Sequence, residues 1–146
     1  MKELIEKENI ALNVICSRWE DAIIKAGELL VNTSYITNEY VDEMVETVKE
    51  LGPYIVIAPH IAIAHARPSA SVIKEGISMM TLKEPVRFGN EDNDPVQIIF
   101  CFGAKSQDNH LEELKELASI IENSEVVEKI KTSNSKDEIY NLINKQ

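Results

Sequence analysis

Apolar residues recur along the first third of the chain in the spacings of one strand and two helices. Residues 9–15, NIALNVI, alternate loosely between apolar and polar, which is typical of a half-buried strand. Over residues 19–30 the apolar side chains return every three or four positions, and a second stripe of this kind runs over 41–48. Thr37 is the predicted N-cap of this second helix, and Gly52-Pro53 predicts its end.

The middle of the chain is typical of strands, and its end is typical of helices. Short apolar runs predict four strands, at residues 54–58, 61–64, 77–82 and 96–102. The last two are joined by KEPVRFGNEDNDP, which has turn chemistry and an acidic cluster. A third helix is predicted from near Ser106, and the tail adds two short helices, the last opening with Ser135 and Glu138 in a capping-box pattern.

This order of elements predicts an α/β fold. We expect a single domain over residues 1–146, with a small mixed sheet of about five strands, parallel and antiparallel, flanked by helices. The order in which the strands pair cannot be read from the pattern.

Composition narrows the classes of partner. The chain has 146 residues, of which 44% are hydrophobic, enough for one real core. Its formal charge of −10 disfavours nucleic acid as a ligand. No apolar run approaches the roughly 20 residues of a membrane span, and the charged N-terminus does not resemble a secretory signal, so we expect a cytoplasmic protein. Cys16 and Cys101 are expected to be small buried hydrophobes rather than a disulfide pair.

The stretch APHIAIAHARP, residues 58–68, holds the strongest candidate chemistry. His65 follows a predicted strand, and a strand end is where a sheet presents residues to ligands. Unperturbed imidazole titrates at about 6.5, so a neutral, nucleophilic nitrogen is available at neutral pH. Arg67 adds a planar fork of donors that suits phosphate or carboxylate. This pattern favours a histidine that handles an anion, but it also occurs in ordinary surface or packing residues, and local sequence leaves both open.

The other two histidines have weaker signals. His110 falls in the predicted first turn of the third helix, where free amide groups favour anions, although a partly buried histidine bonded to a carbonyl fits equally well. His60 is five residues from His65 and is interpreted as a loop residue. A zinc site built from the three histidines is disfavoured, because the helical His-x-x-x-His arrangement is absent.

Taken together, five segments resemble one protein family. The chain is similar to the EIIA components of the bacterial sugar phosphotransferase system, in the mannitol/fructose-type superfamily and closest to its ascorbate-type branch. The resemblance covers almost the whole chain, and its order and spacing make it more specific than any single motif. It is carried by WEDAIIKAGELL (19–30), GPYIVIAP (52–59), HARP (65–68), VRFG (86–89) and HLEELKELA (110–118).

The resemblance implies an EIIA (type 2) domain that works as a phosphohistidine carrier. By the family's motifs, His65 would accept a phosphoryl group from phospho-HPr and pass it to a cysteine of a cognate EIIB, which serves the membrane component EIIC. His110 would stabilise the phosphoryl group, and Arg67 would be a further anion contact. No metal or cofactor is required, because both donor and acceptor are side chains. A homodimer is left open.

Two positions depart from the family pattern. The family commonly has proline before the active histidine, where this chain has Ala64, and glycine where this chain has His60. Pro-His therefore occurs at 59–60 instead of 64–65, but the Ala66-Arg67-Pro68 sequence fixes the register on His65. These departures fit either a carrier for the uptake of ascorbate, pentitol-like or related sugars, or a regulatory EIIA-like module that binds a regulator or transporter when phosphorylated.

Overall fold

The computed structural model describes residues 3–105 and 111–144, and its centre is a mixed sheet. The strands are β1 (Ile10–Val14), β2 (Val56–Ala58), β3 (Ile61–Ala64), β4 (Gly76–Val86) and β5 (Val96–Gly103). The helices are η1, a short 3-10 turn (Lys7–Asn9), α1 (Trp19–Asn32), α2 (Asn38–Leu51), α3 (Leu111–Glu122), α4 (Ser124–Thr132) and α5 (Lys136–Asn144). The predicted α/β class and five-stranded mixed sheet are confirmed.

The strand order is β1-β4-β5-β3-β2. β4 and β5 pair antiparallel at the centre, β1 runs parallel to β4, and β3 runs parallel to β5 with Ala64 opposite Cys101. β2 closes the edge as the antiparallel partner of β3. Because β3 and β5 run parallel, both end at the same edge of the sheet.

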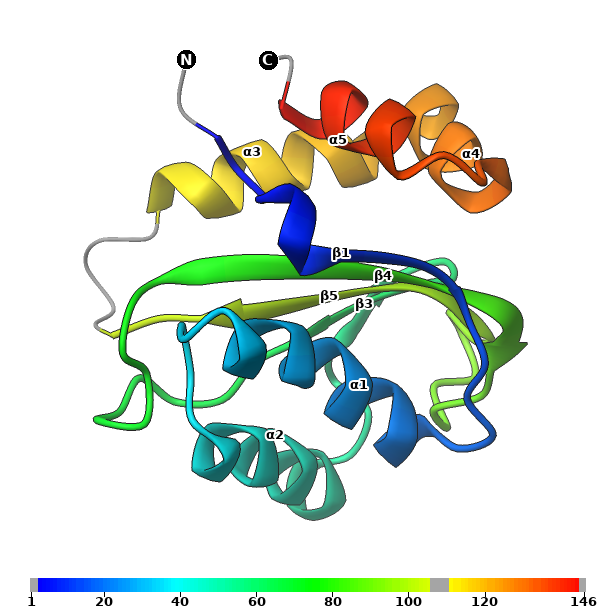
Figure 1. The fold of residues 1–146 in the computed structure, drawn as a ribbon. Helices are drawn as coiled ribbons and strands as arrows, with labels where there is room; N and C mark the ends of the chain where they lie inside the picture. Colours follow the sequence, from blue (N-terminus) through cyan, green and yellow to red (C-terminus); the bar gives the residue numbers. More distant parts are fainter. Residues whose placement is uncertain (1–2, 106–110, 145–146) are drawn as a thin grey trace.

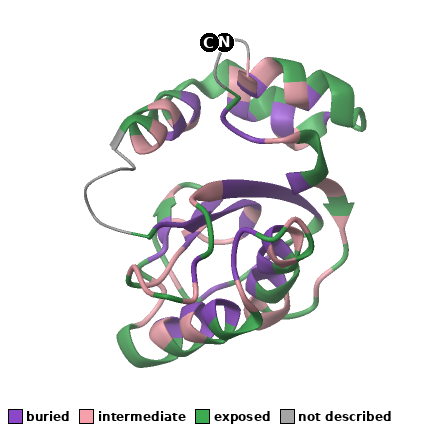
Figure 2. Ribbon diagram, turned by 60° about the vertical axis from the view of Figure 1, so that its left-hand side comes forward, coloured by how far each residue is buried: buried purple, intermediate pink, exposed green. Residues whose placement is uncertain are grey.

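Helices cover both faces of the sheet, as Figure 1 shows: α1 and α2 lie on one side, and α3, α4 and α5 lie on the other. Each face has its own buried cluster, and the buried residues in Figure 2 concentrate along the sheet and the helix faces toward it. β5 contributes residues to both clusters: Ile99 is buried on the side of α1 and α2, and Phe100 is buried on the opposite side. This two-sided burial explains the nearly continuous apolar run VQIIFCF in that strand.

Three local details refine the predicted elements. β4 extends to Val86, beyond the predicted end at residue 82, because Val86 pairs with Val96 across a register shift and is buried. Thr37 does precede α2, but its hydroxyl donates to the carbonyl of Ser71 at 3.2 Å instead of capping an amide. Gly52 ends α2 with φ at 90°, a left-handed conformation that suits glycine.

At the other end of the chain, Ser135 Oγ accepts from the amide of Glu138 at 3.1 Å, as its predicted capping role requires. The predicted start of the third helix near Ser106 lies outside the described residues. None of the helices in the described ranges is both long and apolar enough to cross a membrane.

Candidate functional site

His65 lies directly after β3, at the edge of the sheet where the parallel strands β3 and β5 end. Its Nδ1 is 2.8 Å from the carbonyl oxygen of Ile63. A carbonyl can only accept a hydrogen bond, so Nδ1 carries the proton and donates it. In the neutral ring, Nε2 is then the unprotonated nitrogen with a free lone pair. The backbone of β3 thus selects the tautomer and orients the ring.

A cavity of about 540 Å³ opens beside His65. Its walls come from α2, the β2–β3 segment, the residues after β3 and the start of α3, with Leu51, Ile57 and Leu114 among the apolar contributors. Arg67, exposed, also lines it, so the described residues bring an imidazole and a guanidinium together in a mostly apolar cavity. The two residues that the sequence singled out for anion chemistry, His65 and Arg67, therefore line the same cavity.

Tyr54 contributes an aromatic wall to the same cavity. Its ring stands perpendicular to the His65 imidazole, with 5.4 Å between the ring centroids. Edge-to-face contact of this kind is a favourable aromatic geometry. Partial burial raises the pKa of the Tyr54 phenol, so the side chain is neutral at physiological pH. Tyr54 therefore forms part of the cavity wall and is uncharged.

His60 lies at the opposite end of β3 from His65. It occupies the two-residue turn between β2 and β3 with φ at 69°, a left-handed conformation that favours glycine. Its amide donates to the carbonyl of Asn93 at 2.8 Å, and its Nδ1 donates to the carbonyl of Pro95 at 2.7 Å. His60 borders a different, smaller cavity next to α3 and α4. The interpretation of His60 as a loop residue is confirmed.

Hydrogen bonds from side chains to the backbone hold the acidic connection between β4 and β5 in place. Both oxygens of the Asp94 carboxylate accept backbone amides, from Phe88 at 2.9 Å and Gly89 at 2.8 Å. Asn90 and Asn93 donate from their side chains to the carbonyl of Val56 at 3.2 and 3.0 Å. These bonds fasten the β2–β3 turn to the connection. Across residues 3–105 and 111–144, no three histidine, cysteine, aspartate or glutamate side chains converge to hold a metal.

Sequence reasoning missed Tyr40, which lies on the inner face of α2. Its side chain is fully buried, and its hydroxyl accepts from the amide of Ala66 at 3.0 Å. The same hydroxyl lies 3.1 Å from the carbonyls of Ala66 and Phe102. Burial raises the pKa of the Tyr40 phenol well above its usual range, so the hydroxyl keeps its proton. The available signal was its place one turn before Met44 in the buried stripe, since a buried phenol needs a partner.

The remaining predicted site residue is His110, which lies outside the described residues. The described part of α3 does reach the cavity, since Leu114 lines it. Arg87, in the VRFG segment of the family resemblance, is exposed and is not among the described residues that line this cavity.

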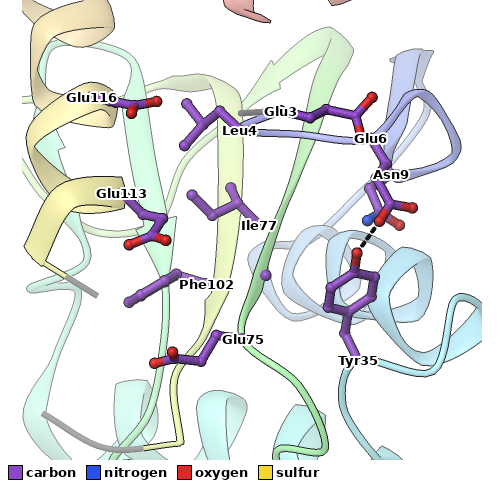
Figure 3. Close-up of a pocket in the computed structure, with 11 residues that line it drawn as sticks. Glu3, Leu4, Glu6, Asn9, Tyr35, Glu75, Ile77, Phe102, Glu113 and Glu116 are labelled. Atoms are coloured by element: carbon purple, nitrogen blue, oxygen red, sulfur yellow. Dashed lines mark hydrogen bonds between the residues drawn. The ribbon is translucent and has the colours of Figure 1, made fainter. Parts of the chain in front are cut away.

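A second cavity, of about 110 Å³, lies on the other face of the sheet and is acidic. Figure 3 shows its glutamates, which come from the N-terminal segment, from the residue directly before β4 and from α3. Tyr35 donates a hydrogen bond to Glu6 at its rim. No basic side chain is present among the described residues that line it. Negative charge of this density repels phosphate, so the cavity beside His65 is the candidate site for anion chemistry.

The sequence matches the family model described as "Phosphoenolpyruvate-dependent sugar phosphotransferase system, EIIA 2" over residues 3–146. The chain belongs to this family. Among its relatives, the ascorbate-specific EIIA component of Escherichia coli strain K12 is 32% identical over 143 residues, which is 97% of this chain and 93% of that protein.

Solved EIIA structures share the fold of this EIIA chain. The crystal structure of IIA mannitol from Escherichia coli superposes with a TM-score of 0.83 at 30% identity, covering 95% of this chain and 98% of that one. The IIA chain in the complex of enzyme IIA and phosphorylated enzyme IIB for mannitol, also from Escherichia coli, gives a TM-score of 0.83 at 28% identity, covering 95% and 96%. These likenesses confirm the family resemblance seen in the sequence.

Proposed function

We propose that this EIIA component is a phosphohistidine carrier that accepts a phosphoryl group from phospho-HPr on Nε2 of His65 and passes it to the cysteine of a cognate EIIB. One observation carries the proposal. Nδ1 of His65 is held by the carbonyl of Ile63 at 2.8 Å, beside an open cavity. A histidine fixed in this way has its lone pair on Nε2 before the donor arrives.

The transfer follows from that arrangement. Nε2 of His65 attacks phosphorus, the P–N bond of the HPr phosphohistidine breaks, and a P–N bond to His65 forms in line with it. The His65 ring gains positive charge as this bond forms, and the Ile63 carbonyl accepts a stronger hydrogen bond from Nδ1–H. Arg67 and His110 would bind the equatorial oxygens, whose charge is spread in the transition state. An EIIB thiolate then attacks the phosphorus and His65 leaves as neutral imidazole.

Partner docking is supported by the apolar surface around the site. Leu51 is 69% exposed and Ile57 is 49% exposed, and both line the cavity beside His65. Exposed apolar side chains gathered around a reactive group are typical of a protein interaction surface. The complex of IIA with phosphorylated IIB for mannitol supports an EIIB as the partner. The ascorbate-specific relative supports an ascorbate-type EIIB in particular.

Intact mass measured after incubation with phosphoenolpyruvate, enzyme I and HPr tests the acceptor. We expect the wild type and His60→Ala to gain one acid-labile phosphoryl group, His65→Ala to gain none, and His110→Ala to gain it more slowly. His60→Ala is the matched control, because it removes a histidine from the other end of the same strand. Loss of phosphorylation in His60→Ala with retention in His65→Ala would move the acceptor to His60.

A second step tests the route onward. Phosphorylated protein is mixed with an ascorbate-type EIIB and, separately, with a mannitol-type EIIB, and loss of the phosphoryl mass is followed over time. Faster transfer to the ascorbate-type EIIB supports that branch. A protein that is phosphorylated on His65 but transfers to neither EIIB would contradict the carrier role and favour the regulatory alternative.

A further inference from the structure

We propose that Tyr40 is a positioning residue for the phosphoryl acceptor: its buried hydroxyl clamps the residue after His65 and so fixes the His65 tautomer. The inference rests on the proposed function of His65. Tyr40 belongs to α2, far from His65 in the sequence, and its side chain is fully buried beneath the site. Tyr40 is also among the residues that border the cavity beside His65.

The clamp is a single hydroxyl with three backbone neighbours. The Tyr40 oxygen accepts from the amide of Ala66 at 3.0 Å. Its one proton is shared between the carbonyls of Ala66 and Phe102, each 3.1 Å away. Since Phe102 is near the end of β5, this hydroxyl ties the segment after β3 to the end of the neighbouring strand.

Two further residues, one directly before α2 and one within it, contact the next part of the segment. Thr37 donates to the carbonyl of Ser71 from its amide at 2.9 Å and from its hydroxyl at 3.2 Å. The Ser71 hydroxyl lies 3.5 Å from the Glu43 carboxylate. Tyr40 and Glu43, three residues apart, lie on one side of α2, and Thr37 directly precedes that helix. Residues 66–71 are therefore supported along α2 rather than left as a free loop.

The hydrogen bonds of Tyr40 bear on the proposed transfer, because the bond that sets the His65 tautomer joins residues only two positions apart and so depends on the backbone between and around them. The Nδ1–H of His65 reaches back to the carbonyl of Ile63, and this geometry requires a fixed backbone around His65. β3 fixes the backbone before His65, through its pairing with β5. Tyr40 fixes it after His65, at Ala66. Without the hydroxyl, the backbone at 65–66 can rotate, and the imidazole is no longer held to one tautomer.

The experiment compares Tyr40→Phe with Tyr35→Phe. Both substitutions remove a hydroxyl and keep a buried ring, but the Tyr35 hydroxyl bonds to Glu6 beside the acidic cavity, away from the His65 segment. The readouts are the rate of phosphoryl transfer from phospho-HPr and the ¹⁵N shifts of the His65 ring. We expect about a tenfold slower transfer in Tyr40→Phe, with His65 shifts that indicate mixed tautomers. Tyr35→Phe should match the wild type in both.

The outcomes separate the two proposals. If the wild type accepts phosphate and Tyr40→Phe matches it in rate and in His65 shifts, the role of Tyr40 is overturned and the acceptor role of His65 stands. If the wild type with competent partners accepts none, the acceptor role fails, and the transfer role of Tyr40 fails with it.

A measurement on the wild type covers the case in which Tyr40→Phe does not fold. The amide of Ala66 donates to a buried phenol, so its hydrogen exchange should be slowed by about a hundredfold or more relative to an exposed amide. Exchange of the Ala66 amide at the rate of an open amide would overturn the clamp.

Discussion

Replacing His60 with glycine and with alanine measures the strain in the β2–β3 turn. His60 has φ at 69° in a turn of two residues, and the left-handed region is unfavourable for any residue with a Cβ. Glycine adopts this conformation freely, whereas alanine keeps the Cβ and its cost. Both variants lose the same hydrogen bond from Nδ1 to the Pro95 carbonyl, so their difference isolates the backbone.

Three contributions set the size of the effect. Left-handed φ costs about 1–2 kcal/mol for a residue with a Cβ. Glycine offsets part of this gain, because its greater freedom in the unfolded chain costs about 0.4–1 kcal/mol. The lost hydrogen bond costs about 0.5–1.5 kcal/mol in either variant. We therefore expect His60→Gly to be more stable than His60→Ala by about 1 kcal/mol, and to lie close to the wild type.

Urea unfolding followed by circular dichroism measures these differences, with thermal unfolding as a second assay. For a chain of this length, about 1 kcal/mol corresponds to a difference of about 3 °C in Tm. Equal m-values across the three proteins are required, so that the change in midpoint reports native-state stability.

A result in which His60→Ala is as stable as His60→Gly would refute the reasoning, because it would mean that residue 60 does not adopt the left-handed conformation. Phosphorylation provides the functional control. His60 lies at the end of β3 opposite His65, so both variants should accept a phosphoryl group at the wild-type rate.

Three further predictions concern the rest of the molecule. Burial raises the pKa of the Cys101 thiol to about 12, so a thiol reagent at pH 8 should label only the half-buried Cys16 in the native protein, and two labels by mass would contradict this. A Cβ added at Gly76 would lie 2.3 Å from the Tyr35 ring, so Gly76→Ala should lower the free energy of unfolding by about 1–3 kcal/mol, and an unchanged urea midpoint would contradict the crowding. Burial and the bond to Glu6 raise the pKa of Tyr35 from 10.0 to about 12. As pH rises, the unfolded chain loses this proton before the native protein does. The contribution of Tyr35 to the free energy of unfolding is therefore complete below pH 10 and falls as pH rises to 12. Unfolding measured over this pH range should show a smaller fall in stability for Tyr35→Phe than for the wild type.

Much of the fold could be predicted because local pattern and tertiary burial agree. The stripe over 19–30 and the signals at Thr37 and Gly52 place two helices within two residues of their observed bounds. The prediction of a turn directly after residue 82 was wrong in part. The lysine, glutamate and proline there favour a turn, but the pairing of Val86 with Val96 in β5 extends the strand. Strand order depends on pairings between distant segments, which a local pattern does not contain.

From the sequence, some side chains of the candidate site could be predicted, but the backbone group that orients them could not. His65 and Arg67 stand in a recognisable segment, and the structure places both at one cavity. The group that orients His65 is the main-chain carbonyl of Ile63, and any residue type would supply it, so the sequence carries no sign of it. Tyr40 was missed because its ring fits an apolar stripe, and only the fold shows what its hydroxyl contacts.

The parallel pairing of β3 with β5 also has a consequence for synthesis on the ribosome. β3 ends at Ala64, and β5 begins only at Val96, after β4. Until β5 has left the exit tunnel, a nascent chain contains His65 but lacks both the neighbouring strand and the Phe102 carbonyl that Tyr40 contacts. Contacts between segments so distant in sequence form late, because closing the intervening loop is slow. This edge of the sheet can therefore be completed only after residues 96–103 have been synthesised, and a fragment released before that point would expose the apolar residues 61–64 to degradation and aggregation.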